Sequence, residues 1–341
     1  MPATSIRDVI VKNDDLVAGT HGRGIWILDD ITPLRQWNTN SGGSAKASAE
    51  REPILFSPQV AYRVRQNTNT DTPIPPDEAA GKNPPDGAII NYSLPADASG
   101  PVSLEILDGA GKTIRRYSST DRIEDPDPAL VPVPTYWYRA AERLSAAAGM
   151  HRFVWDIHYQ PIPGGGGGRG GLPIAAVPHD TVPVPTGPWA APGQYTVKLT
   201  VEGKGYTQPL TLKMDPRVKT APLGLAQQFT LSKQLYDGII EAQKSLEELR
   251  ALKATVAQRG GSAASVVNGL TKLEGQPIGR GAAADTPDTF NSVIAGMNQL
   301  MGLLQGADAT PTTQVVKAVT DRRAALTKLQ TRWTALKAEA R

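Results

Sequence analysis

Four residues near the start of the chain have side chains that could bind or act on a substrate. His21 and Arg23 stand close together, and Asp29 and Asp30 follow as an adjacent pair. Two carboxylates roughly 5–9.5 Å apart serve as acid, base or nucleophile in glycosidases, and an arginine can clamp a substrate carboxylate. These four are our candidate binding residues, although neighbouring residues on one strand point to opposite faces, which would separate the two acids.

A structural interpretation of the same residues competes with this one. Gly22 and Gly24 can give the backbone the shape of a tight turn, with polar side chains between them. The acid pair also suits the end of a strand. Trp155, next to Asp156, is typical of the core of a central strand rather than of a catalytic pair. We therefore assign no catalytic residue to this chain.

The residue content excludes several classes of chemistry. Cysteine is absent, so the chain has no disulfide, zinc–thiolate site, iron–sulfur cluster or thiol nucleophile. The histidines show neither His-x-His nor His-Glu-x-x-His spacing, so we expect no metal and no cofactor. There is no Gly-x-Ser-x-Gly motif of the α/β-hydrolases. The run GGGGGRGG at 164–171 lacks the Gly-Lys-Ser/Thr of a phosphate-binding loop, which indicates a flexible loop.

The charge pattern does not favour a nucleic-acid partner. The 36 Lys and Arg residues against 33 Asp and Glu residues give a formal net charge of +3. Basic residues gather between 317 and 341, where they are typical of the solvated face of a helix. No run of about 18 apolar residues occurs, so we expect no transmembrane segment. The start lacks the apolar region of a signal peptide, and the localisation stays open.

Residues 1–37 are expected to form strands. Apolar runs cover 6–11, 16–19 and 24–29. The small and polar run 38–52 has no apolar period and is predicted to be a linker. The 33 glycines and 29 prolines in 341 residues fit a protein rich in turns and argue against an all-helical fold.

Residues 53–215 are predicted to form an Ig-like antiparallel β-sandwich. Short segments alternate between apolar and polar residues, as half-buried strands do. The expected strands are 88–94, 102–106, 113–117, 152–159, 195–201 and 210–214. Two long loops, 120–145 and 161–192, interrupt them, and loops of this length are either functional or disordered.

Residues 216–341 are predicted to be helical. Apolar residues recur at the three-to-four-residue spacing of helices from Leu235 to Val256, from Phe290 to Leu304 and from Val319 to Leu336. Thr310, before Pro311, is a candidate N-cap of the last helix. Each apolar stripe must be covered, so three or four helices are expected to form an antiparallel bundle.

The stretch LVAGTHGRGIWILDD, residues 16–30, resembles the last blade of BNR/Asp-box β-propellers, the sortilin-like and sialidase-like proteins of bacteria often described as glycosyl hydrolases. In those proteins a strand ending in Gly-Thr meets a glycine-containing turn, and an aromatic residue on the next strand, here Trp26, packs between blades. The resemblance is degenerate, because Gly22 stands where the Asp-box has its aspartate. It implies a multidomain β plus α protein with a partial propeller blade, the sandwich and the bundle.

The resemblance also implies a function. A propeller needs at least ~4 blades of ~40–45 residues, and residues 1–37 cannot close such a ring. We therefore expect the chain to be the C-terminal part of a longer, exported protein, periplasmic or extracellular, or else the first strands to pack onto the sandwich. The favoured role is a non-catalytic accessory region whose partners are the rest of the propeller and a protein or glycan ligand.

Two alternatives remain open. In the first, the parent is a sialidase-like glycoside hydrolase whose active site lies in blades outside this chain. In the second, the chain is a free-standing adhesion module that uses the loops 120–145 and 161–192 as its contact surface.

Overall fold

The computed structural model describes residues 3–40 (backbone only at 38–40), 52–65, 72–75, 77–78, 81–123, 127–129, 131, 133–163, 174–181, 187–258, 264–277 and 288–340. The predicted combination of β sheets and α helices is confirmed. The chain divides into two compact units, a mostly β unit before residue 217 and a mostly helical unit after it. Residues 161–163 and 187–191, which the sequence pattern places in a loop of the sandwich, belong to the helical unit.

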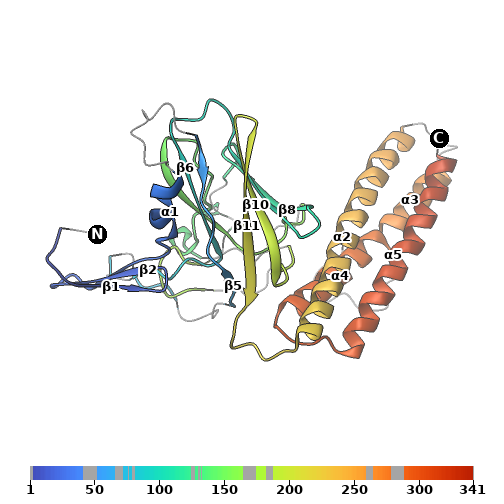
Figure 1. Ribbon diagram of the computed structural model, residues 1–341. Coiled ribbons are helices and arrows are strands. Elements are labelled where there is room, and N and C mark those ends of the chain that lie inside the picture. The colour runs from blue at the N-terminus through green and yellow to red at the C-terminus, as the bar shows by residue number, and fades with distance from the viewer. Residues whose placement is uncertain are drawn as a thin grey trace. The chain divides into compact units, whose positions relative to one another are not determined.

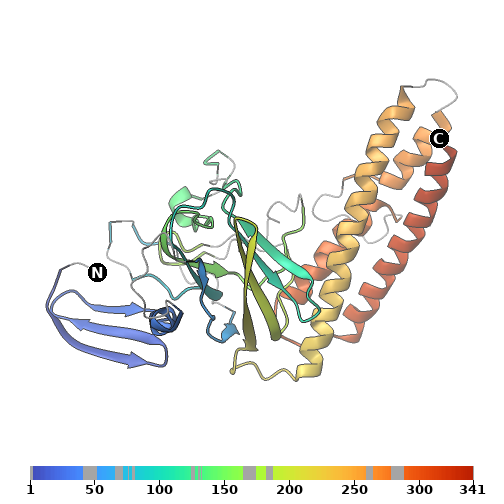
Figure 2. The ribbon, with the colours of Figure 1, turned by 45° about the horizontal axis from the view of Figure 1, so that its top comes forward.

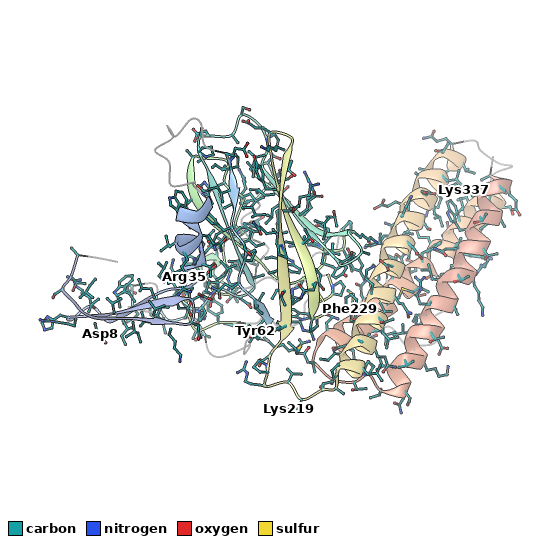
Figure 3. The ribbon with its side chains drawn as sticks, in the orientation of Figure 1. Asp8, Arg35, Tyr62, Lys219, Phe229 and Lys337 are labelled. Atoms are coloured by element: carbon teal, nitrogen blue, oxygen red, sulfur yellow. The ribbon has the colours of Figure 1, made fainter. Side chains whose placement is uncertain are left out.

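The first three strands form a separate antiparallel sheet in the order β1-β2-β3, and β1 and β2 are labelled in Figure 1. The strands are β1 (Ile6–Lys12), β2 (Asp15–Thr20) and β3 (Ile25–Leu28). They lie side by side in Figure 2, and helix α1 (Thr32–Asn40) follows β3. No helix was expected here, and its last residues fall inside the predicted linker 38–52. Arg35 of α1, labelled in Figure 3, donates to Asp14 Oδ1 at 2.6 Å.

Two further sheets make up the rest of the β unit. The five-stranded sheet has the order β5-β11-β10-β7-β8, and the three-stranded sheet has the order β4-β6-β9. All neighbouring strands are antiparallel except β5 and β11. Their bounds are β4 (Ile54–Leu55), β5 (Ala61–Arg63), β6 (Ala88–Leu94), β7 (Ser103–Leu107), β8 (Thr113–Ser118), β9 (Gly149–Trp155), β10 (Gly193–Val201) and β11 (Lys204–Met214).

The core of the β unit lies where side chains of these two sheets meet. Trp155 of β9 is fully buried and lies edge-on to Tyr195 of β10, with 5.6 Å between ring centroids. Phe153 of β9 contacts Tyr117 of β8 in the same way at 4.6 Å. Edge-to-face pairs of this kind add to the free energy gained by burying the rings.

The strand predicted over 152–159 begins and ends earlier than its pattern suggests. β9 covers Gly149–Trp155, and the chain then turns at Ile157, whose φ is +57°. His158 and Tyr159 therefore lie beyond the strand, and the alternation of strand faces does not apply to them. Within the loop 120–145, a short 3₁₀ helix spans Thr135–Trp137.

The helical unit contains α2 (Pro222–Ala257), α3 (Ala264–Glu274), α4 (Phe290–Gln305) and α5 (Thr313–Glu339). α2 packs against the other three, and α5 also contacts α3 and α4. Their apolar stripes are buried, as Leu235 and Ile239 show with no exposed surface. The cap of α5 is Thr312, whose side chain accepts from Val315 N, and not Thr310. Among the described residues, no helix has both the length and the apolar character needed to cross a membrane.

Candidate functional site

The β1–β2–β3 sheet exposes apolar side chains on both of its faces. The register places Ile10 opposite Val17 and Val17 opposite Ile27, so these share one face. Val9 and Trp26 share the other face across Ala18. Ile10 is 53% exposed and Ile27 59%, while Val9 is 49% and Trp26 39% exposed. The described part of the chain therefore covers neither face completely.

An antiparallel sheet with one solvated face normally alternates between apolar and polar residues. The sequence Ile-Trp-Ile-Leu of β3 has no such alternation, and all four of its residues are exposed. Contiguous exposed apolar surface marks a place where a protein, a membrane or a ligand packs. The sheet is therefore the strongest candidate for a functional surface in this chain.

The turn between β2 and β3 is held by its glycine backbone conformations and by hydrogen bonds from side chains to its backbone. Gly22 and Gly24 have φ of +76° and +71°, a backbone conformation that residues with a side chain rarely adopt. Thr20 Oγ1 donates to Gly24 O at 2.6 Å, and Trp26 Nε1 donates to Arg23 O at 2.9 Å. His21 and Arg23 are exposed at this turn.

The structure does not bring the four candidate binding residues together. His21 and Arg23 precede β3, whereas Asp29 and Asp30 follow it. The four residues of β3 between them span about 13 Å at roughly 3.3 Å per residue. A single substrate site made by all four is therefore not formed by this sheet.

Asp30 lies in a buried hydrogen-bond network. Its side chain is 2% exposed, and its φ is +57°. Oδ1 accepts from Thr32 N at 3.0 Å and from Thr32 Oγ1 at 2.6 Å, which caps the start of α1. Oδ2 accepts from Asn91 Nδ2 at 2.8 Å. Because both carboxylate oxygens have partners and solvent barely reaches them, Asp30 serves structure rather than catalysis.

Arg152 of β9 completes this network. Its Nη2 donates to Asp29 O at 2.5 Å and to Asp30 O at 3.1 Å, and its Nε donates to Asn91 Oδ1 at 3.2 Å. Asn91 and Arg152 are direct neighbours in the β6–β9 register. We call the set Asp30, Asn91 and Arg152 the anchor, because it ties the end of the β1–β2–β3 sheet to β6 and β9.

Sequence reasoning found Asp30 but missed its two partners in the anchor. One signal was available, because Asn91 interrupts the apolar run Ala88–Leu94, and buried polar side chains in such runs need a hydrogen-bond partner. Nothing in the sequence pairs Asn91 with an aspartate 61 residues away.

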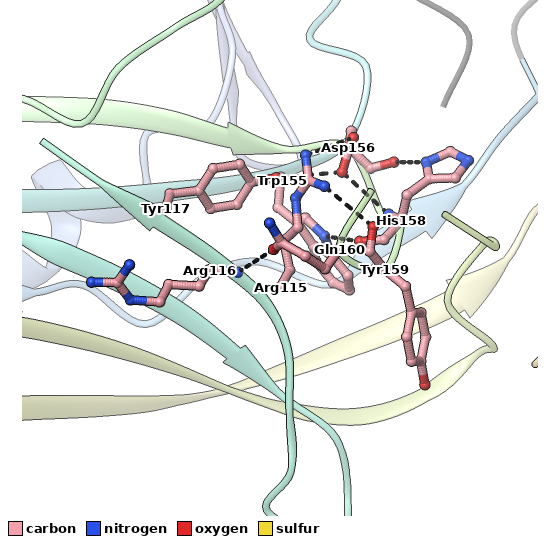
Figure 4. A network of polar contacts seen from close by, with 8 residues as sticks. All are labelled: Arg115, Arg116, Tyr117, Trp155, Asp156, His158, Tyr159 and Gln160. Atoms are coloured by element: carbon pink, nitrogen blue, oxygen red, sulfur yellow. Dashed lines mark hydrogen bonds and ion pairs between the residues drawn. The ribbon is translucent and has the colours of Figure 1, made fainter. Parts of the chain in front are cut away.

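A second polar cluster surrounds Asp156, just after β9 (Figure 4). Arg115 Nη2 donates to Asp156 Oδ2 at 3.4 Å, and Tyr117 OH donates to Asp156 Oδ1 at 3.4 Å. His158 N donates to Asp156 Oδ1 at 3.2 Å, and Arg115 Nη1 donates to Tyr159 O at 3.2 Å. The cluster thus ties the turn after β9 to strand β8.

The electrostatics of this cluster do not suit acid–base catalysis at neutral pH. His158 Nδ1 lies 2.6 Å from Asp156 O and carries the hydrogen, because a carbonyl oxygen only accepts. Burial lowers the pKa of His158 to about 4, although the nearby Asp156 carboxylate acts in the opposite direction. Burial, followed by the charge of Asp156, raises the pKa of Tyr117. Both shifts move the pKa away from pH 7, near which a general acid or base works best.

No other feature of the described residues points to a catalytic centre or a known family. Among these residues, no group of three or more His, Asp or Glu side chains could hold a metal ion. No family model matches the chain, and comparisons with curated proteins and with solved structures give no match either. A function is therefore inferred from the exposed β1–β2–β3 sheet and its anchor.

Proposed function

We propose that this chain is a non-catalytic accessory and interaction region of a BNR/Asp-box β-propeller protein of the sortilin-like, glycosyl-hydrolase-like kind. In this proposal β1, β2 and β3 belong to the terminal blade of the propeller. Strands β4 to β11 form an Ig-like sandwich, and α2 to α5 form an antiparallel bundle. The principal partner is the rest of the propeller.

One observation carries the proposal, namely the apolar side chains exposed on both faces of the β1–β2–β3 sheet. Blades of a propeller are arranged radially around a channel, so each blade has a neighbour on both faces. A sheet that only packed onto the sandwich would need one apolar face. Three strands with two bare faces are also poorly stable in water by themselves.

The anchor supports an accessory role for the other parts. It fixes the end of this sheet to β6 and β9 through the side chains of Asp30, Asn91 and Arg152. A buried carboxylate and an arginine that share hydrogen-bond partners form a directional connection, unlike a flexible linker. The sandwich is therefore held against the blade that it braces.

The proposal predicts further blades in the same reading frame upstream, and the test is a binding assay with that propeller segment, produced separately. The double variant Ile10→Thr/Ile27→Thr alters one face, and Val9→Thr/Leu28→Thr alters the other. Because these side chains are about half exposed, each variant keeps its thermal midpoint within about 2 °C, as surface substitutions of small effect do. Each is expected to bind the propeller segment at least tenfold more weakly.

Leu223→Gln is the matched control, since Leu223 is an 82% exposed leucine on α2. It should bind the propeller segment like the unaltered chain. The proposal is contradicted when both face variants bind as well as the control does. Hydrolysis of aryl glycosides by the purified chain, lost on changing one of its carboxylates, would overturn the non-catalytic assignment.

A further inference from the structure

Helix α1, labelled in Figure 1, is held on one side to the turn between β1 and β2. Arg35 Nη1 donates to Asp14 Oδ1 at 2.6 Å, and Arg35 Nη2 donates to Asn13 O at 3.3 Å. Directly before the helix, Ile31 N donates to Asp14 O at 2.7 Å. These three hydrogen bonds connect α1 to the β1–β2–β3 sheet at the turn that joins its first two strands.

The same helix is also held to the segment directly after β4. Gln36 Nε2 donates to Ser57 O at 3.0 Å, and Gln36 Oε1 accepts from Ser57 N at 2.8 Å. The side-chain amide thus exchanges with Ser57 the two hydrogen bonds that a residue of a neighbouring antiparallel strand would exchange. The ring of Trp37 stacks on the buried ring of Phe56, with 5.9 Å between the centroids and 22° between the planes. A polar and an apolar contact therefore fix α1 to this segment.

The contacts of α1 and the anchor meet at Asn91 of β6. Its side chain binds Asp30 and Arg152, and its backbone oxygen accepts from Phe56 N at 3.1 Å. The anchor holds the chain just before α1, whereas Gln36 lies four residues after the first residue of the helix, about 6 Å along its axis at roughly 1.5 Å per residue. One point of contact allows rotation about that point, but two separated contacts define an orientation.

We propose that α1 is a bracket that keeps the β1–β2–β3 sheet at one orientation to β6 and β9, with Gln36 and Trp37 as its positioning residues. The run 38–52, predicted from the sequence to be a linker, does not set this orientation, because Gln36 before it and Ser57 after it are in direct contact. The sheet therefore presents its two apolar faces in fixed directions. The inference stands on contacts within this chain, whichever surface covers those faces.

A bracket and a flexible linker respond differently to added residues. The span of a flexible linker grows with the number of its residues. Between two ends that are already fixed, added residues only raise the entropic cost of closing the loop, and this cost grows slowly with length. Inserting Gly-Ser-Gly-Ser-Gly-Ser after Gly43 should therefore leave the orientation of the sheet unchanged. Removing the contacts of Gln36 and Trp37 should release it.

The experiment measures the distribution of distances between two nitroxide spin labels on the full chain by electron–electron double resonance. The chain has no cysteine, so Arg7→Cys on β1 and Ala96→Cys in the loop after β6, both at exposed positions, take the labels uniquely. We expect one narrow distribution, also with the insertion, and one at least twofold wider in Gln36→Ala/Trp37→Ala. The matched control is Leu34→Gln, a 56% exposed position on the same helix, which should keep the narrow distribution.

A second variant covers the case in which the double variant does not fold. Gln36→Glu keeps the size of the side chain but has no donor for Ser57 O, so it should also widen the distribution. A second label pair within the sandwich, Ala96→Cys and Lys213→Cys, should keep its width in every variant.

Four results overturn the proposal. They are a wide distribution in the labelled chain without further changes, an unchanged width in the Gln36 variants, equal widening in Leu34→Gln or on insertion, and widening of the pair within the sandwich. The second would show that the anchor alone holds the sheet. The last would show that Gln36 serves the folding of the sandwich rather than the orientation of the sheet. No partner enters these measurements, so the bracket and the proposed function can fail independently of each other.

Discussion

Three structural roles coincide at Asp30, which makes it the most informative single residue for mutagenesis. It caps α1, accepts from Asn91 and adopts a left-handed backbone conformation. Asp30→Ala should lower the free energy of unfolding by about 2–4 kcal/mol, because loss of a cap costs about 1 kcal/mol and a buried polar partner left unsatisfied costs about 1–3 kcal/mol. Urea denaturation measures this loss.

Asp29→Ala is the matched control for Asp30. Arg152 contacts only the backbone oxygen of Asp29, which the substitution keeps. We expect a loss below about 0.5 kcal/mol, as is usual for partly exposed sites. Equal losses of unfolding free energy in the two variants would contradict the stabilising role of the Asp30 side chain in the anchor.

His158 should make the stability of the β unit depend on pH. Its pKa is about 4 in the folded chain and 6.5 ordinarily, so folding favours the neutral ring. The neutral His158 contributes its full share to the stability of the fold above pH 6.5, and this contribution is lost as the pH falls from 6.5 to 4. The loss of unfolding free energy amounts to roughly 3.5 kcal/mol at about 1.4 kcal/mol per pKa unit.

Unfolding free energies at pH 7.5, 5.5 and 4.5 measure this dependence. The charged groups that act on His158 are Asp156, Arg115 and Arg65. His158→Asn cannot titrate, and it should therefore flatten the slope between pH 6.5 and 4. An unchanged slope in this variant would show that other groups cause it.

The sequence could identify Asp30 as unusual but not its environment. An aspartate pair is visible by residue type alone, whereas the partner Arg152 is 122 residues away from Asp30. The strand rule that separates Asp29 from Asp30 also fails here, because β3 ends at Leu28 and Asp30 has a positive φ. Long-range hydrogen bonds and backbone conformation lie outside what spacing can show.

At the scale of elements, periodicity predicted the long and regular segments well. The strand expected over 88–94 is β6 with the same bounds, and the helix expected from Phe290 to Leu304 is α4 to within one residue. The short helix α1 was not predicted, and α3 lies in the region predicted to be helical but has none of the three apolar stripes that were identified there. α1 is capped by Asp30, which itself needs Asn91, and α3 has a glycine at its centre, so local pattern alone does not favour either helix.

Among the glycines that stand at the start of a strand, Gly87, directly before β6, should tolerate replacement least. Its φ is +146°, and a Cβ there would lie 2.1 Å from Trp155 O, a backbone atom of β9. Gly87→Ala must therefore displace β6 from β9. We expect the free energy of unfolding, measured by thermal or urea denaturation, to fall by more than about 3 kcal/mol.

Gly111→Ala is the control for Gly87. Its φ is +78°, and nothing lies within 4 Å of the added Cβ. Only the left-handed backbone opposes the substitution, so the expected loss is about 1–2 kcal/mol. A similar loss at both positions would show that the close approach of β9 at Gly87 is unimportant.

At the scale of the whole molecule, one disagreement between pattern and structure carries functional meaning. The apolar run Ile25–Leu28 has the pattern of a strand buried on both faces, yet the described residues leave it exposed. Places where local rules and the observed environment conflict are where functional surfaces are expected. Sequence pattern can indicate burial, but it cannot show whether this chain or a partner provides the cover.

The division into a β unit and a helical unit predicts two separate unfolding transitions. Gln305 of α4 joins two parts of the helical unit, because its Nε2 donates to Ser232 Oγ at 2.7 Å and its Oε1 accepts from Trp189 N at 2.8 Å. Gln305→Ala leaves the fully buried Ser232 without this donor. The free energy of unfolding of the helical unit should fall by about 1–3 kcal/mol.

Scanning calorimetry of the unaltered chain and of Gln305→Ala, each at pH 7.5 and pH 5, separates the two units. Lowering the pH to 5 acts on the β unit through His158 and should shift its transition most, because the lowered pKa values of Glu248 and Glu274 in the helical unit have their effect mainly below pH 5. Gln305→Ala should shift only the transition of the helical unit. Asn298→Ala is the control, since the exposed Asn298 side chain donates only within its own helix, to Ile294 O. A single transition that moves under both changes would mean that the units unfold as one cooperative body, because separate cores unfold separately only when little free energy couples them.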